Sequence, residues 1–156
     1  MTTEQDAQVL QLSRLIIAQF EGCKLEAYQD QRGIWTIGFG QTGPTIKQGL
    51  TWTQQQADDA LDQTLSFLWK RLDHALGRDL LPQQAAAVLS LAYNCGLGAL
   101  ERSEMWKMLQ DGQTLPAADR FTSFDKIRLP SGLLQTDVGL LNRRKAERAL
   151  FLSTLV

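Results

Sequence analysis

Two carboxyl side chains and one hydroxyl near the start of the chain have the types and surroundings that hydrolysis of a glycosidic bond requires. Such a reaction needs a protonated acid at the leaving oxygen and a carboxylate, or a water that it holds, near the anomeric carbon. Glu21 follows Phe20 at the end of an apolar helical face, where dry surroundings favour a protonated carboxyl. Asp30 lies in a polar turn, where a carboxylate stays ionised, and Thr36 offers a hydroxyl to orient the water.

Each of these residues also has a simpler explanation when it is taken alone. A glutamate at a helix end is usually a surface charge, an aspartate before a glycine is usually a turn residue, and a threonine in a strand is usually a β-former. The functional prediction therefore depends on their combination and on the elements that position them.

Periodicity predicts the elements around these residues. Apolar residues at helical spacing predict a helix over residues 4–21, which Gly22 ends. Residues 25–50 contain several glycines and an alternation of β-formers, which is typical of a small antiparallel sheet. The capping-box pattern at Thr53 begins a long helix that Gly77 closes. Its core stripe is expected to be Ala57, Leu61, Leu65, Leu68, Leu72 and Leu76.

Helices dominate the remaining sequence. Pro82 suits the first turn of a helix that runs to Gly96, and Ser103 caps a short helix that ends near Gly112. The expected elements after these are a helix over 116–125, a turn at 130–132, and a last helix from Asp137 through Phe151.

This outline is an α+β fold in which the strands lie near the N-terminus. We predict one domain over residues 1–156. It would have a sheet lobe at about 22–52, and a helical lobe at about 78–156 that includes the N-terminal helix. A groove between the lobes could hold an extended polymer.

Composition excludes several other classes of protein. The chain has 156 residues, 44% of them hydrophobic, and a formal net charge of -1, so it lacks the excess of basic residues that nucleic-acid binding needs. Four basic residues in the last helix are interpreted as a solvated face: Arg143, Arg144, Lys145 and Arg148. The polar start and the short apolar run at 15–18 predict no signal peptide and no membrane insertion, hence a cytoplasmic location.

The metal-binding residue types are sparse. His74 has no cluster of cysteine or carboxylate partners in the sequence, so it is expected at a surface or boundary position of a helix, and no metal is predicted. Cys23 and Cys95 are expected to be small buried thiols, or to form a disulfide after export.

The arrangement of motifs resembles glycoside hydrolase family 24, the phage-type lysozymes or endolysins. Their signature is Glu, eight residues, Asp, five residues, Thr, and Glu21, Asp30 and Thr36 have this spacing. Further segments similar to the family are residues 92–96, residues 103–112 and residues 139–151. The resemblance covers about residues 10–152.

The resemblance implies a lysozyme-like fold and a muramidase activity. The bond cut would be the β-1,4 link from N-acetylmuramic acid to N-acetylglucosamine in peptidoglycan, with inversion and without a cofactor. Glu21 would be the general acid, and Asp30 and Thr36 would activate and orient water. Arg143 matches a family arginine that reaches the catalytic glutamate. Host lysis would follow holin-dependent release of a monomer from the host cytoplasm to the cell wall.

Four more residues are expected to contact substrate: Gln41, Thr42, Tyr93 and Asn94. Gln41 stands where the family usually has histidine. A glutamine still donates and accepts hydrogen bonds but does not titrate, so we expect activity with altered stability or pH response.

Three alternatives stay open from the sequence. A lytic transglycosylase would use a single glutamate and release anhydro products. A peptidoglycan-binding module would keep the fold without turnover. The same catalytic domain could also serve as a secreted effector or a tail-associated enzyme.

Overall fold

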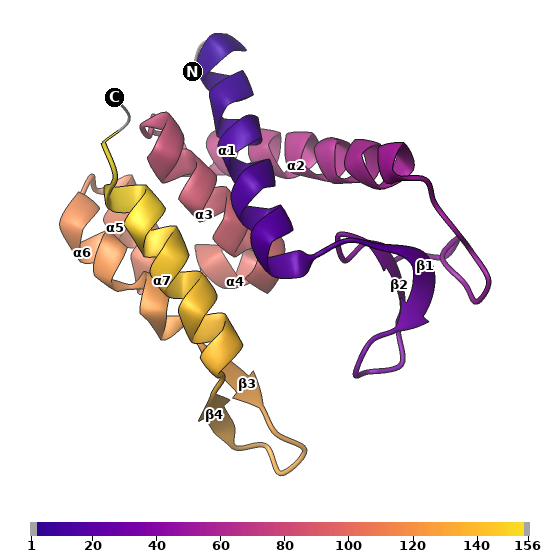
Figure 1. The fold of residues 1–156 in the computed structure, drawn as a ribbon. Helices are drawn as coiled ribbons and strands as arrows, with labels where there is room; N and C mark the ends of the chain where they lie inside the picture. Colours follow the sequence, from indigo (N-terminus) through magenta and orange to yellow (C-terminus); the bar gives the residue numbers. More distant parts are fainter. Residues whose placement is uncertain (1–2, 155–156) are drawn as a thin grey trace.

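A long helix joins a small lobe containing a β-hairpin to a larger lobe made mostly of helices (Figure 1). The computed structural model describes residues 3–154. The N-terminal part contains α1 (Thr3–Glu21), β1 (Lys24–Gln29), β2 (Trp35–Gly38) and α2 (Gln54–Leu76). The rest contains α3 (Pro82–Cys95), α4 (Leu97–Glu101), α5 (Glu104–Gln110), α6 (Thr114–Asp119), a 3-10 turn (Phe121–Ser123), β3 (Lys126–Arg128), β4 (Leu134–Thr136) and α7 (Val138–Leu152). The predicted α+β fold class is confirmed.

The helical lobe is built around α3. Residues on nearly every side of this helix are buried, as expected for a helix that is apolar all round. The helices α1 and α7 pack against it, and Phe121 and Phe151 meet edge-to-face in the same core at a centroid distance of 5.4 Å. The core therefore fixes the C-terminal end of α1, where Glu21 lies, relative to α7, where Arg143 lies.

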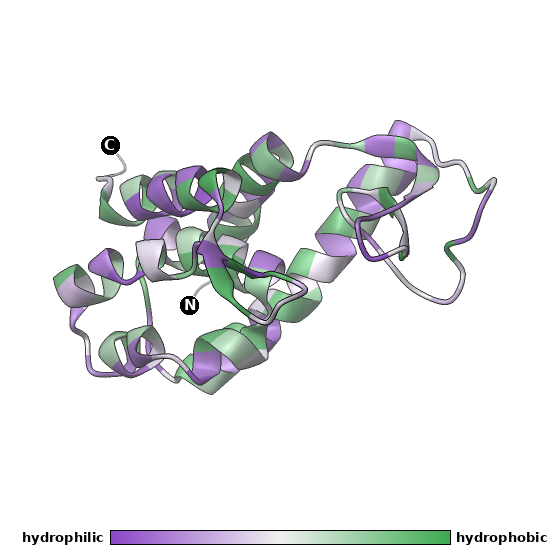
Figure 2. Ribbon diagram, turned by 90° about the horizontal axis from the view of Figure 1, so that it is seen from below, coloured by the Kyte–Doolittle hydropathy of each residue, from purple (hydrophilic) through white to green (hydrophobic). Residues whose placement is uncertain are grey.

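The helix α2 runs from the sheet lobe to the helical lobe (Figure 2). Thr53 caps its start with the predicted capping box, and Gly77 ends it in the left-handed conformation at φ 65°. One residue of the predicted core stripe was placed wrongly. Leu68 is only half-buried, and Trp69 enters the core instead, where its indole donates a hydrogen bond to Asp6.

The sheet lobe is an irregular antiparallel hairpin. Tyr28 pairs with Thr36, and the register shifts between Lys24 and Tyr28. The segment before α2 adds to the hairpin, because Ala27 N donates to Leu50 O and Trp52 N donates to Leu25 O.

Two elements of the helical lobe differ from the sequence prediction. The single helix expected over 116–125 is α6 followed by a 3-10 turn. The turn predicted at 130–132 is the tip of the hairpin β3–β4, whose strands are too short to give a clear alternating pattern. No helix within residues 3–154 is long and apolar enough to cross a membrane.

The isolated residues flagged in the sequence have simple environments. His74 is exposed on α2, as expected. Cys23 and Cys95 are free thiols, and both are half-buried rather than buried as predicted. Burial raises the pKa of the Cys95 thiol to about 11. Among the described residues, no group of histidine, cysteine and carboxylate side chains is arranged to hold a metal ion.

Candidate active site

A cavity of about 700 Å³ lies between the two lobes and brings the predicted site residues together. Glu21, Asp30 and Thr36 line it, although they come from a helix end, a turn and a strand. The four residues expected to contact substrate also line it: Gln41, Thr42, Tyr93 and Asn94. The fold therefore brings the three proposed catalytic residues and the four expected substrate contacts to one cavity.

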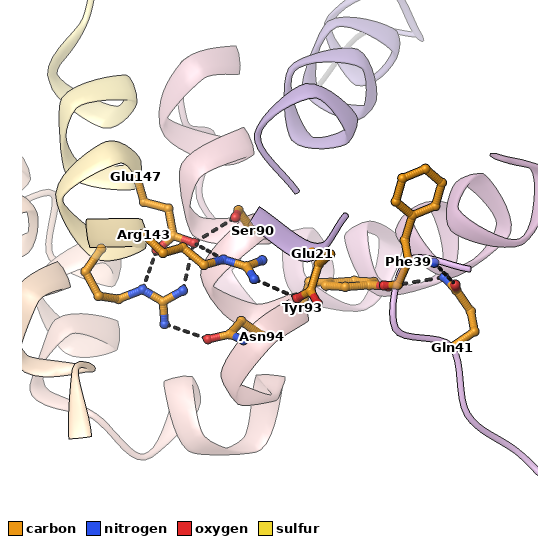
Figure 3. Close-up of polar contacts among 9 residues, drawn as sticks. Glu21, Phe39, Gln41, Ser90, Tyr93, Asn94, Arg143 and Glu147 are labelled. Carbon is orange, nitrogen blue, oxygen red and sulfur yellow. Dashed lines mark hydrogen bonds and ion pairs between the residues drawn. The ribbon is translucent and has the colours of Figure 1, made fainter. Parts of the chain in front are cut away.

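Glu21 is the last residue of α1 and is held by a charge from the other end of the chain. Arg143 Nη1 donates to Glu21 Oε1 at 2.6 Å (Figure 3). The Glu21 side chain is 23% exposed and the Arg143 side chain only 5%. Gly40 lies close to the other carboxyl oxygen of Glu21, Oε2. A Cβ atom at position 40 would be only 3.3 Å from it. The φ of +91° at Gly40 also favours glycine.

Arg143 belongs to a buried polar cluster on α7 and α3. Glu147 Oε1 accepts hydrogen bonds from Ser90 Oγ at 2.7 Å and Arg144 Nη2 at 2.9 Å, and Arg143 Nε lies 3.3 Å away (Figure 3). Arg144 Nε forms a second ion pair with Glu147 Oε2 at 2.7 Å. Burial raises the pKa of Glu147, and the positive charge of Arg144 opposes that shift.

These contacts correct the interpretation of the last helix as a solvated basic face. Arg143 and Arg144 are 4% and 0% exposed, whereas Lys145 is exposed. Helical periodicity places basic residues on a face but does not reveal a buried carboxylate partner. Glu147, four residues after Arg143, was the signal that sequence reasoning missed.

Asp30 is held by the backbone of its own turn. Its Oδ1 accepts from Arg32 N at 2.8 Å and from Ile34 N at 2.9 Å, which is the Asx geometry that aspartate favours in turns. The hydrogen bond from the Ile34 amide, together with the Arg32 contacts, lowers the pKa of Asp30 below its ordinary value. Asp30 is therefore a carboxylate near neutral pH, as the sequence predicted.

Thr36 is 4% exposed, and its hydroxyl donates to the Ile34 carbonyl at 2.9 Å. Its oxygen can therefore accept a hydrogen bond from a water in the cavity. Opposite Thr36 on β1, Tyr28 also lines the cavity. Its pKa is raised by burial and by the charges of Glu21 and Asp30, so the phenol stays a neutral hydrogen-bonding group.

A set of hydrogen bonds connects the two lobes through Phe39, Gln41 and Tyr93. Gln41 Oε1 accepts from Phe39 N at 2.8 Å, and Gln41 Nε2 donates to the Tyr93 hydroxyl at 3.1 Å (Figure 3). The Tyr93 hydroxyl in turn donates to Phe39 O at 2.6 Å. Burial and the charge of Glu21 raise the pKa of Tyr93, so this donor persists at neutral pH. Gln41 and Tyr93 thus already have partners within the protein.

Asn94 also has a structural contact, since its Oδ1 accepts from Arg144 Nη1 at 3.0 Å. Asn94 therefore connects the cavity wall to the buried cluster around Glu147. Thr42 lines the cavity beside Gln41.

Comparison with known proteins shows the family to which the chain belongs. A family model described as phage lysozyme matches residues 18–147. The endolysin of Acyrthosiphon pisum secondary endosymbiont phage 1 is 33% identical over 137 residues, which span 88% of this chain and 92% of that protein. The structure of an endolysin from Escherichia coli O157:H7 phage FAHEc1 has a TM-score of 0.85 at 28% identity and covers 92% of each chain.

A muramidase domain of SpmX from Asticaccaulis excentricus is also similar, with a TM-score of 0.84, 26% identity, and coverage of 91% of this chain and 95% of that one. The fold and these similarities together define the class of protein as a lysozyme-like glycoside hydrolase. More narrowly, the chain belongs to the phage lysozyme family.

Proposed function

We propose that this cleft hydrolyses the β-1,4 bond from N-acetylmuramic acid to N-acetylglucosamine in bacterial peptidoglycan. The main observation in support is that Glu21 and Asp30 line one cavity but are held in different ways. A buried guanidinium holds Glu21, and backbone amides hold Asp30. Two carboxyls in unlike surroundings can take the two roles that glycoside hydrolysis divides between acid and base.

In the proposed mechanism, the protonated Glu21 transfers its proton to the leaving oxygen as the glycosidic C–O bond breaks. A water molecule forms the new bond to the anomeric carbon from the opposite face, and Asp30 accepts a proton from it. Thr36 accepts a hydrogen bond that orients this water. Arg143 then stabilises the Glu21 carboxylate left by the transfer. Such a single displacement inverts the configuration at the anomeric carbon.

Product analysis tests hydrolysis against transglycosylation. Digestion of purified peptidoglycan is expected to give muropeptides with ordinary reducing ends, because water is the nucleophile. Mass spectrometry distinguishes these from 1,6-anhydro products, which are lighter by one water. Anhydro-muropeptides as the main product would identify a lytic transglycosylase instead, and no soluble product would identify a binding module.

The role of Asp30 predicts a specific pH response. Because the pKa of Asp30 is lowered, its carboxylate persists as the pH falls, and the activity that depends on it is lost only below the usual carboxyl range near pH 4. Asp30→Asn keeps an oxygen that accepts from the turn amides but removes the base, so kcat/KM is expected to fall about 10²-fold or more. Profiles of kcat/KM from about pH 3 to pH 7 measure both effects. A variant with the wild-type profile would exclude Asp30 from the reaction.

The biological setting extends the same proposal. We infer that a single catalytic domain acts as a monomer on the cell wall and leaves the host cytoplasm through a holin-made lesion. Within the folded domain, Ile16 and Ile17 of the apolar run at 15–18 pack in the core.

A further inference from the structure

The helix α2 has a second face that the reaction described above does not use. Its core stripe includes Leu65, Trp69 and Leu72. Four other residues, spaced as neighbours on one side of a helix, line the same cavity as Glu21 and Asp30. They are Thr64, Phe67, Leu68 and Arg71. This face explains why Leu68 leaves the predicted core stripe, and it makes α2 a wall of the cleft.

Phe67 presents an aromatic surface on this wall. Its side chain is 64% exposed, although the guanidinium of Arg71 lies over the ring at 5.7 Å from the centroid. The half-buried Leu68 beside it extends the apolar surface. Ligand clefts are lined by aromatic and apolar side chains with a few polar groups that fix orientation. An open ring next to Leu68 fits the C–H face of a pyranose.

Arg71 supplies a charge without a carboxylate partner. Two arginines line the cavity, and the other one, Arg32, lies 3.4 Å from the Asp30 carboxylate. Among residues 3–154, no carboxylate lies within ion-pair distance of Arg71. Its guanidinium instead contacts the Phe67 ring. A guanidinium pairs with carboxylates through two parallel N–H donors. Peptidoglycan brings carboxylates to such a wall on the lactyl-peptide substituents of its muramic acid.

We propose that Phe67 and Arg71 form a substrate subsite on α2, in which the Phe67 ring packs against a sugar ring and Arg71 binds a carboxylate of the lactyl-peptide substituent. The inference deepens the proposed function and depends on it, because the ligand is the peptidoglycan strand itself. Continuity with the cavity of Glu21 and the unpaired charge of Arg71 support it.

The test compares native peptidoglycan with peptidoglycan whose carboxylates have been amidated. Arg71→Gln is expected to lower kcat/KM about 5-fold on the native substrate, through KM, and to equal wild type on the amidated one. The loss of kcat/KM that Arg71→Gln causes on the native substrate should become smaller in high salt, because salt screens an exposed charge pair. Phe67→Ala is expected to lower kcat/KM about 10-fold on both substrates, because the sugar ring is unchanged.

Controls separate this subsite from general effects on the helix. Lys70→Gln removes a neighbouring exposed charge that does not line the cavity, and it should match wild type on both substrates. In intact strands the lactyl carboxyl is joined to the stem peptide as an amide, so the carboxylate that Arg71 binds belongs to the stem peptide, and amidation removes its charge. The subsite alone is overturned if wild type cleaves peptidoglycan but Arg71→Gln does not lower kcat/KM. It is also overturned if Arg71→Gln lowers kcat/KM equally on native and amidated substrates. A wild-type protein that cleaves neither substrate overturns the proposed function and the subsite with it.

Discussion

Glu21→Gln is expected to lower the rate of peptidoglycan hydrolysis by about 10³-fold or more and to leave the fold intact. The glutamine oxygen can still accept the hydrogen bond that Arg143 Nη1 now donates to Glu21 Oε1 at 2.6 Å. An amide cannot transfer a proton to the leaving oxygen, so the substitution removes the acid and keeps the shape. Release of soluble muropeptides from purified peptidoglycan measures the loss, with far-ultraviolet circular dichroism as the check on folding.

Glu26→Gln is the matched control for this experiment. Glu26 is an exposed glutamate on β1, and the cavity residues do not include it. Its substitution should change the rate by no more than about twofold, because surface charges away from a site contribute little. Equal clearing of permeabilised cells by Glu21→Gln and wild type would refute the acid assignment.

Glu147→Gln is expected to have the largest effect on stability, a loss of about 3–5 kcal/mol in the free energy of unfolding. Glu147 is 0% exposed and pairs with both Arg143 and Arg144, so its neutralisation leaves two buried guanidiniums with one carboxylate, Glu21. An uncompensated buried charge costs far more than a lost surface pair. Urea denaturation measures the change, and the melting temperature should fall by about 10 °C.

Asp119→Asn on α6 provides the comparison, because Asp119 forms an exposed ion pair with α7. Arg148 of α7 pairs with Asp119 at 2.8 Å, but the two side chains are 41% and 69% exposed. Breaking this exposed pair should cost less than about 1 kcal/mol. If Glu147→Gln were no less stable than Asp119→Asn, the buried cluster would not have the energetic role assigned to it.

The cluster links stability to the active site. Arg143 contacts Glu21 on one side and Glu147 on the other, so the same guanidinium orients the proposed acid and belongs to the core of the helical lobe. Glu147 is 0% exposed and contacts both guanidiniums, so the cluster that orients Glu21 is itself fixed within the core.

The elements with strong local signals were predicted closely from the sequence. The capping box at Thr53 and the left-handed Gly77 bound α2, and Asp137 caps α7 as expected. Such signals depend on side-chain to backbone contacts within a few residues, so they are present in the sequence itself. The short α4 and the hairpin β3–β4 were not predicted, because elements of three to five residues show too few periods.

The sequence by itself determined the positions of the three proposed catalytic residues, because their spacing lies within one short segment, residues 21–36, whose local structure it also encodes. The family resemblance implied Arg143 as the partner of Glu21, but only the tertiary structure decided the contact itself and the buried cluster behind it. Arg143 lies 122 positions away, and its burial depends on Glu147 and on the packing of α7 against α3. The second face of α2 was decided in the same way. Helical periodicity places Phe67 and Arg71 on one side of the helix, but the cavity that this side lines exists only when the two lobes are in place.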